Sequence, residues 1–487
     1  MKTSGRTALN SLIVLTISAL SYGCGSSNDR VVSAFDVDDT DWKPTPKDAL
    51  AADYAASDAA ADASQPLDTQ SDTAPATDSQ ADSGPDAVIV ADVGGGLPSE
   101  ITQIGAPASF FDVAGIHAVK LSVDATEWAA YMAGVNQPDG LKVYDWHPAT
   151  VEIDEKPYGS VGLHGFGNGS QLDNPQKPNI RIKFDQYDGA NVGPDGEKAF
   201  RLKASGQDAT FVRELLAGAL LRDIGGNAPR AGWARVWVNG QDFGPYQLQE
   251  SVDKRYFKQA FGNNDGDKFA TLYGCYGFDC PEGGCDKLAA AWEGSPGNTQ
   301  TIADLAQAIS EATDADLKQV LNDHFYLGDL LANYAVDALL SNIDGLASAG
   351  QNFTVYNDMK TKRLRIIATG TDLTFGGFDA WYDLQTPWGK PNAWCPARVD
   401  QLYARIWQVP ELKAKLLNKF KALQCGMFRP EVLLPLVTSY KLALKPFLSS
   451  DPKNKQSAAQ IEVAYGALAS YIQKRQQTLT DLLGACP

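Results

Sequence analysis

The stretch ARVWVNGQDFGPYQLQE, residues 234–250, has the pattern of a β-hairpin. Asn239 and Gly240 form the Asn-Gly pair that suits a type I′ turn, because both turn positions need a positive φ. On either side of this pair, apolar and polar residues alternate with the period of a strand. Four more segments alternate in the same way: residues 119–124, 148–165, 178–187 and 199–205. The sequence therefore predicts an antiparallel sheet in the first half of the folded chain.

Helical patterns surround and follow this sheet. Residues 208–223 have the apolar period of a helix, and Gly225-Gly226 provides a stop. Further along the chain, helical periods dominate, and one strand pair interrupts them between residues 353 and 376. They cover residues 301–312, 315–323, 327–341, 399–408, 410–424, 430–448 and 457–483. A sheet-rich lobe followed by a helical lobe predicts a two-lobed α+β fold.

The order of features between residues 196 and 257 is distinctive. A basic-apolar strand is followed by Asp208, an Arg-Glu helix, a Pro-Arg step, the Val-Asn-Gly hairpin and Glu250. In this order the chain resembles the spore-coat protein H (CotH) kinase family, as a bacterial exported lipoprotein member. The resemblance covers residues 108–484 and includes the helix YIQKRQQTLTDLL, where the family has an Arg before a leucine pair. It implies an atypical protein-kinase-like fold with an N-lobe over 108–290 and a C-lobe over 291–487.

Polar side chains between Asn342 and Gly376 are the strongest candidates for chemistry. Kinase-like folds orient a hydroxyl and hold Mg²⁺ with a particular order of features. That order is an acid, an amide, a strand-like crossing and a second acid beside a glycine turn. The resemblance implies that Asp344 orients the attacking hydroxyl and that Asn352 and Asp372 are metal ligands. The alternative is that these residues are turn formers, which hydrogen-bond to their own backbone.

Nucleotide binding is expected to involve Glu214, on the helix after Asp208, paired with a lysine of the preceding sheet. The candidates are Lys177, Lys183 and Lys203, and Lys183 is preferred because it lies in the middle of an alternating strand. The glycine run GLHGFGNGS, residues 162–170, lacks the third glycine of G-x-G-x-x-G, so it predicts a flexible turn near the nucleotide.

Two positions depart from the family pattern. The family often has a second acid two residues before the last one, and this chain has Gly370 there; an Arg frequent in the family is replaced by His164. Fewer acids weaken a metal site or abolish it. A kinase-like scaffold that acts as a surface binding or assembly protein is therefore the alternative to an active enzyme.

The N-terminal region predicts export. Residues 1–23 combine Lys2, Arg6, an apolar stretch and small residues before Cys24, which is the pattern of a bacterial signal peptide. Cys24 is the predicted lipidation site, with a plain secretory signal as the alternative. Residues 24–100 are acidic and rich in Ala, Asp, Ser, Thr and Pro, so they predict a disordered linker before a folded domain over 101–487. The formal net charge of −17 argues against nucleic acid as a partner.

Six cysteines remain when Cys24 is set aside: Cys275, Cys280, Cys285, Cys395, Cys425 and Cys486. An even number in an exported chain favours disulfides, although the sequence does not choose among the pairings. The alternative for the first three is a zinc knuckle, which their spacing and the lack of a nearby His disfavour.

Taken with the resemblance, these features predict a membrane-anchored kinase at the outer membrane or cell surface. The predicted cofactors are ATP and Mg²⁺, with Mn²⁺ as an alternative metal. The expected partner is a protein substrate or surface-coat protein, and the membrane is contacted through the lipid anchor only. The sequence does not identify the substrate or the oligomeric state.

Overall fold

The computed structural model describes residues 110–486, apart from residue 114 and residues 138–143, 168–173, 272–276, 282–283, 286–287, 290–291, 296–298, 378–379 and 388–399. Contacts group the chain into Met1–Lys43 and Pro44–Pro487, and every described residue belongs to the second unit. The predicted signal peptide, Cys24 and the linker lie outside the described residues, so the predictions for them and for the domain boundaries stay predictions.

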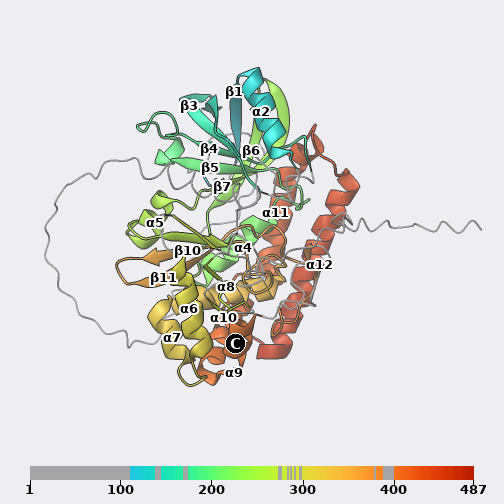
Figure 1. Cartoon of the computed structure of the whole chain (residues 1–487). Helices are drawn as coiled ribbons and strands as arrows, with labels where there is room; N and C mark the ends of the chain where they lie inside the picture. The colour runs from blue at the N-terminus through green and yellow to red at the C-terminus, as the bar shows by residue number, and fades with distance from the viewer. Residues whose placement is uncertain are drawn as a thin grey trace, which may run out of the picture. The chain divides into compact units, whose positions relative to one another are not determined.

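The first half of the described chain forms a closed β-barrel with the strand order β1-β2-β3-β4-β5-β7-β6 (Figure 1). Its strands are β1 (Ile116–Val123), β2 (His147–Ile153), β3 (Lys156–Gly165), β4 (Ile180–Lys183), β5 (Ala199–Lys203), β6 (Ala231–Val238) and β7 (Gln241–Glu250). Neighbouring strands pair antiparallel except β1 and β6, whose parallel pairing closes the barrel. The expectation of a purely antiparallel sheet was therefore wrong at this one seam.

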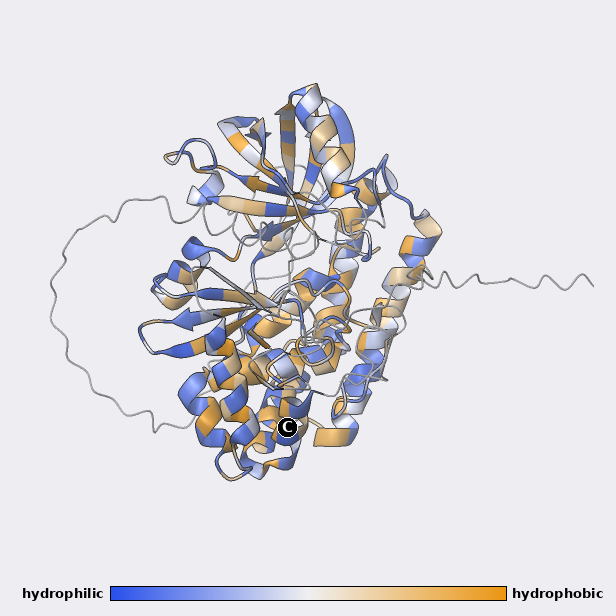
Figure 2. Ribbon diagram, viewed as in Figure 1, coloured by the Kyte–Doolittle hydropathy of each residue, from blue (hydrophilic) through white to orange (hydrophobic). Residues whose placement is uncertain are grey.

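Alternating side chains explain why these strands close on themselves. Along β4 and β5, residues such as Ile180, Ile182, Phe200 and Leu202 are fully buried inside the barrel, and the residues between them face outward. Figure 2 shows the same alternation of hydrophobic and hydrophilic colours along the barrel strands. Closure covers the apolar face and leaves no exposed sheet edge.

The β6–β7 hairpin confirms the turn prediction. Asn239 and Gly240 have φ angles of 51° and 78°, as a type I′ turn requires. The Asn239 side chain also accepts a hydrogen bond from Val123 N at 2.8 Å and donates one to Val123 O at 2.9 Å. The turn residue thus extends the pairing between β6 and the end of β1.

Helix α4 (Arg213–Asp223) begins later than the predicted residue 208. Asp208 accepts hydrogen bonds from Thr210 N and Arg213 N, and Phe211 has a φ of 58°, which no helix accommodates. The carboxylate therefore builds a tight turn before the helix. Because that turn ends directly at Arg213, Glu214 falls in the first helical turn.

A second sheet has the order β11-β10-β8-β9, with β8 (Lys268–Thr271), β9 (Trp292–Ser295), β10 (Phe353–Asp358) and β11 (Arg363–Ala368). It pairs a strand from before residue 290 with the strand pair predicted between residues 353 and 376. Helix α5 (Lys254–Phe261) follows the barrel and stacks Phe257 on Tyr356 of β10, with ring centroids 4.3 Å apart.

Helices make up most of the remainder. They are α6 (Gln300–Glu311), α7 (Leu317–His324), α8 (Leu327–Leu340), α9 (Gln401–Gln408), α10 (Pro410–Cys425), α11 (Pro430–Ser449) and α12 (Ala458–Leu483). They match closely the helices that the apolar period predicts. Nearly every residue of α8 is buried, so it is the central helix of this lobe. A short helix, α2 (Ala125–Val135), packs on the barrel.

Several contacts join the barrel to the helical lobe. Helix α4 contacts both β6 and α8, and α11 contacts β7. The indole of Trp233 in β6 lies edge-on to Tyr440 of α11, with ring centroids 5.2 Å apart. In Figure 1, α11 and α12 run beside each other along both parts. The prediction of an α+β fold with a strand-rich first part and a helical second part is confirmed.

Candidate active site

An ion pair between Lys203 and Glu214 forms the centre of the candidate site. Lys203 is the last residue of β5, and its Nζ lies 2.5 Å from Glu214 Oε2 and 3.2 Å from Asp372 Oδ1. The three side chains are 12%, 5% and 13% exposed. Burial by itself lowers the pKa of Lys203, but the charges of Asp372 and Glu214 and hydrogen bonds to both outweigh it and hold that pKa above its usual value. The lysine is therefore a fixed positive charge between two carboxylates.

The expected pairing of Glu214 with a strand lysine is thus present, but the preference for Lys183 as that partner was wrong. Lys183 lies opposite Ala199 in the β4–β5 register, four residues along β5 from Lys203. At about 3.3 Å per residue, this places it roughly 13 Å along the strand from the site. The Lys183 ammonium lies over the Trp146 ring, 5.9 Å from its centroid.

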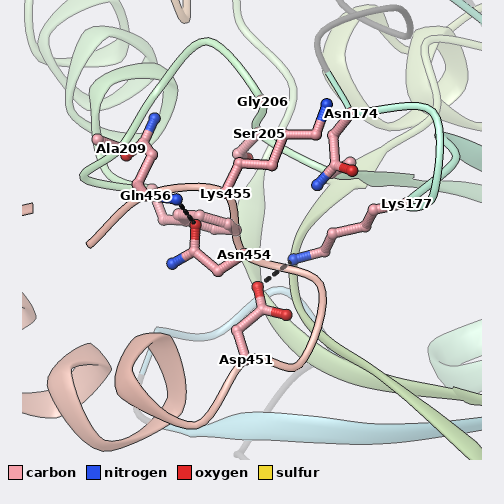
Figure 3. Close-up of a pocket in the computed structure, with 11 residues that line it drawn as sticks. Asn174, Lys177, Ser205, Gly206, Ala209, Asp451, Asn454, Lys455 and Gln456 are labelled. Atoms are coloured by element: carbon pink, nitrogen blue, oxygen red, sulfur yellow. Dashed lines mark hydrogen bonds and ion pairs between the residues drawn. The ribbon is translucent and has the colours of Figure 1, made fainter. Parts of the chain in front are cut away.

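Lys177, the third candidate, belongs to a different ion pair. Its Nζ lies 2.6 Å from Asp451 Oδ2, in the loop between α11 and α12, and both side chains are almost fully buried (Figure 3). Its ammonium also lies over the rings of Phe211 and Tyr246. Burial lowers the pKa of Lys177 by more than Asp451 raises it. This pair connects the barrel to the helical lobe.

Further hydrogen bonds hold Glu214 in place. Glu214 Oε1 accepts from Gln249 Nε2 at 2.5 Å and from Gly370 N at 3.1 Å. The carboxylate therefore connects β5, β7 and the segment that leads to Asp372. Sequence reasoning missed Gln249, although its alternation with the buried Leu248 places it on the same barrel face as Lys203.

Local geometry explains why residue 370 is a glycine. Gly370 has a φ of 61°, and a Cβ at this position would lie 2.9 Å from Asn352 Cγ. An acid in the family's place would need this left-handed backbone and would displace Asn352. The glycine instead brings its N–H to Glu214 and lets Asn352 approach the backbone beside Asp372.

Asp344 and Asn352 lie on the other side of Asp372. Asp344 accepts a hydrogen bond from Gln351 Nε2 at 2.9 Å and a further one from Asn352. Burial raises the pKa of Asp344, and the nearby charge of Asp372 raises it further. Asp344, Asn352 and Asp372 are all partly exposed. The structure therefore brings together Asp344, Asn352, Asp372 and Glu214, with Lys203 in place of Lys183.

The loop that carries Asp344 is built on Asp337, which sequence reasoning missed. Asp337 Oδ1 accepts from Asn342 Nδ2 at 2.7 Å, and its Oδ2 accepts from Ala347 N at 3.3 Å. Burial raises the pKa of Asp337 to about 6. A Cβ on Gly345 would lie 2.4 Å from Asp337 Oδ2, so the loop closes only with glycine there.

Arg475 of α12 fastens this loop to the segment after Asp372. It is fully buried and donates to Ser341 Oγ at 2.7 Å and to Tyr382 O at 2.9 Å, and it lies 4.0 Å from the centroid of the Trp381 ring. Tyr382 N in turn donates to Ser341 Oγ at 3.0 Å. The arginine was noted in the sequence only as a feature of the C-terminal helix, because its partners lie far away in the chain.

The glycine run near residue 165 is partly strand. Residues 162–165 belong to β3, where His164 is fully buried beside Trp146, with ring centroids 4.5 Å apart. A Cβ on Gly165 would lie 2.3 Å from Val135 Cγ1, so this glycine serves packing. The prediction of a flexible turn was therefore wrong for this part, and residues 168–170 lie outside the described residues.

Oxygen donors at the site suit a hard cation. Within the described ranges, no group of three or more His, Cys, Asp or Glu side chains has the arrangement of a metal centre. Mg²⁺ does not require one, since it is usually held by one or two carboxylates, waters and substrate phosphates. Asp372 and Asn352 provide one carboxylate and one amide oxygen, and Asp344 adds a second carboxylate nearby. These residues fit Mg²⁺ bound together with a nucleotide.

Two disulfides occur among the described cysteines, Cys280–Cys285 and Cys425–Cys486. The expectation of disulfides is confirmed for these four residues. The zinc alternative for the first cluster is wrong, because Cys280 and Cys285 are bonded to each other; Cys275 and Cys395 lie outside the described residues. None of the helices in the described part of the chain combines the length and apolar character needed to cross a bilayer.

Comparison with known proteins adds two findings. A family model described as CotH kinase protein matches residues 163–479, a span that contains all the site residues named above. The chain is also 22% identical over 350 residues to the inner spore coat protein H of Bacillus subtilis (strain 168), an alignment that covers 69% of this chain and 90% of that protein.

Proposed function

Because this chain belongs to the CotH kinase protein family, we propose that it is an exported atypical kinase that transfers the γ-phosphoryl group of ATP to Ser or Thr of surface or extracellular proteins. The observation that carries this proposal is the ion-paired set of Lys203, Glu214 and Asp372, with Asn352 and Asp344 beside it. The set joins the barrel to the helical lobe, where the kinase-like fold that the family implies binds its nucleotide.

Each side chain has a role that its position supports. Glu214 fixes the Lys203 ammonium, which binds the phosphates of ATP as a positive charge. Asp344 accepts a hydrogen bond from the acceptor hydroxyl and orients it, and its raised pKa suits a group that also takes up the hydroxyl proton. Asp372 and Asn352 hold Mg²⁺, or alternatively Mn²⁺, which neutralises charge on the phosphates when it is bound.

The location and partner are proposed on separate grounds. The Cys280–Cys285 and Cys425–Cys486 disulfides favour an oxidising compartment outside the cytoplasm. The curated relative is described as a spore coat protein, which supports a coat or surface protein as the acceptor here. Lipidation at Cys24 would provide the anchor, and a Cys24→Ser variant should then leave the membrane fraction.

The decisive experiment measures phosphate incorporation from γ-labelled ATP into several Ser/Thr-containing surface proteins. The wild type should label at least one acceptor, and Asp344→Asn should reduce the rate by a hundredfold or more, as expected for loss of a general base. Asp304→Asn, an exposed change on α6, is the matched control for charge and should have no effect. Equal rates for Asp344→Asn and wild type would overturn the assignment of Asp344.

A kinase-like scaffold without catalysis is the second candidate. The glycine at position 370 favours it, since an acid that the family often has is absent from the metal site. Under this alternative, the domain binds a surface protein and assembles it. Binding of a surface protein by a chain that neither binds Mg²⁺ with ATP nor labels any acceptor would support the scaffold and reject the kinase.

A further inference from the structure

Two arginines face each other on the barrel surface that leads to Lys203. In the register of the sheet, His164, Arg181, Arg201 and Gln249 form one row across β3, β4, β5 and β7, which neighbour one another in Figure 1. Gln249 at the end of the row donates to Glu214. The row therefore lies on the same barrel face as the candidate active site.

This arrangement is unfavourable for the protein alone. Arg181 and Arg201 are directly opposite on adjacent strands, where like charges destabilise a sheet. The half-buried Asp253, the N-cap of α5, lies near Arg181, and Arg181 opposes the rise that burial causes in the pKa of Asp253. Among the described residues, no carboxylate is ion-paired with Arg201. Its Nε is buried and donates to no acceptor, and its guanidinium lies over the Phe166 ring, 5.3 Å from the centroid.

Arg201 also lies close to the centre of the active site. It stands two residues before Lys203 on the same face of β5, a separation of about 7 Å between Cα atoms. A chain of two or three phosphoryl groups can contact both side chains at that separation. The planar guanidinium binds phosphate through paired hydrogen bonds, and an anion there would neutralise the charge of Arg201.

We propose that Arg201, supported by Arg181, forms a subsite for the polyphosphate chain of the nucleotide, next to Lys203. This inference rests on the proposed function for the identity of the ligand as a nucleoside triphosphate. The subsite itself requires only that a polyphosphate anion binds to this face of the barrel. The Arg201 charge, which lies opposite Arg181 in the sheet, thereby becomes part of the affinity for the ligand.

The test is calorimetric titration of the full chain with sodium tripolyphosphate and, separately, with Mg²⁺ and ATP. Arg201→Gln should weaken both affinities by tenfold or more, because a charge-assisted paired hydrogen bond is lost. Arg201→Lys, which keeps the charge but not the planar fork, should fall between Arg201→Gln and wild type. Arg363→Gln, an exposed change at the start of β11, is the matched control and should bind within twofold of wild type.

A second readout separates this role from a structural one. Arg201→Gln should melt at the same temperature as wild type or higher without ligand, because it removes a like-charge contact. A melting temperature several degrees lower, or tripolyphosphate affinity within twofold of wild type, would overturn the inference. So would a wild type that does not bind tripolyphosphate.

The outcomes also distinguish this inference from the kinase proposal. Binding of tripolyphosphate that depends on Arg201, in a chain that labels no acceptor, would support the subsite and reject the kinase. Phosphate transfer with an unchanged KM for ATP in Arg201→Gln would reject the subsite and support the kinase.

Discussion

Two buried lysines of the same molecule, Lys177 and Lys203, pair with carboxylates in opposite ways. Lys177 has one carboxylate partner, Asp451, and lies among aromatic rings, so burial dominates and lowers its pKa. Lys203 has two carboxylate partners, Glu214 and Asp372, so their charges dominate and raise its pKa. The first pair is neutral and almost fully buried, whereas the second leaves negative charge on a partly exposed Asp372. The comparison separates a structural ion pair from one that is arranged to receive a ligand.

The largest expected difference between the two lysines is in phosphate transfer. Lys203→Met should lower the rate per folded molecule by about a hundredfold to a thousandfold, because a positioned charge on the phosphates is lost. Lys177→Met should leave that rate within a few-fold of the wild-type rate, since Lys177 pairs with Asp451 and not with a residue of the candidate active site. Labelling rates, corrected for the folded fraction by circular dichroism, measure both. Equal losses of transfer rate in the two variants would contradict the distinction between the two lysines.

Stability should show the reverse order, with the larger loss at the Lys177 pair and the smaller loss at the Lys203 pair. Asp451→Ala leaves the Lys177 charge buried without a partner and should lower the free energy of unfolding by about 3–5 kcal/mol. Asp372→Ala should lower it by less than Asp451→Ala does, since Lys203 keeps Glu214 as a charged partner. Urea denaturation followed by fluorescence measures both.

A double substitution sharpens this result. Lys177→Met combined with Asp451→Leu replaces the ion pair by apolar side chains and should recover most of the lost stability. If the double variant is as unstable as Asp451→Ala, the Lys177–Asp451 pair does not behave as a structural ion pair, and the comparison fails.

How far these features could be predicted from the sequence depends on their range along the chain. The Asn239-Gly240 turn and the helices α8 to α12 are encoded locally, by turn chemistry and apolar period, and were predicted. Short motifs also surround four of the candidate site residues, so the sequence identified them: Glu214, Asp344, Asn352 and Asp372.

Features that depend on register or on distant contacts could not be predicted. The choice of Lys203 over Lys183 follows from the pairing of β4, β5 and β7, which alternation alone does not reveal. Asp451 lies 274 residues from Lys177 in a loop without a motif. The parallel β1–β6 pairing that closes the barrel is equally non-local.

The smallest expected effect is the dependence of stability on alkaline pH. The pKa of Lys177 is lower in the folded state than the ordinary 10.5, so the unfolded state binds more protons and this lysine makes stability rise as pH increases toward 10.5. The pKa of Lys203 in the folded state is raised above 10.5. Its contribution to stability is therefore fully present below pH 10.5 and is lost only as the pH rises further. Wild type compared with Lys177→Met between pH 8 and about 10.5 should therefore differ in slope. Parallel stability curves for the two proteins would contradict the assignment for Lys177.

Binding of ATP in the presence and absence of Mg²⁺, measured by calorimetry on the full chain, tests the central claim most directly. Wild type and the exposed control Asp304→Ala should bind ATP with a strong dependence on Mg²⁺. Asp372→Ala should keep its fold and lose this binding, at a cost of several kcal/mol, or on the order of a thousandfold in transfer rate. Equal Mg²⁺-dependent binding by Asp372→Ala and wild type, or no binding by wild type, would contradict the assignment of this ion-paired set as a nucleotide site.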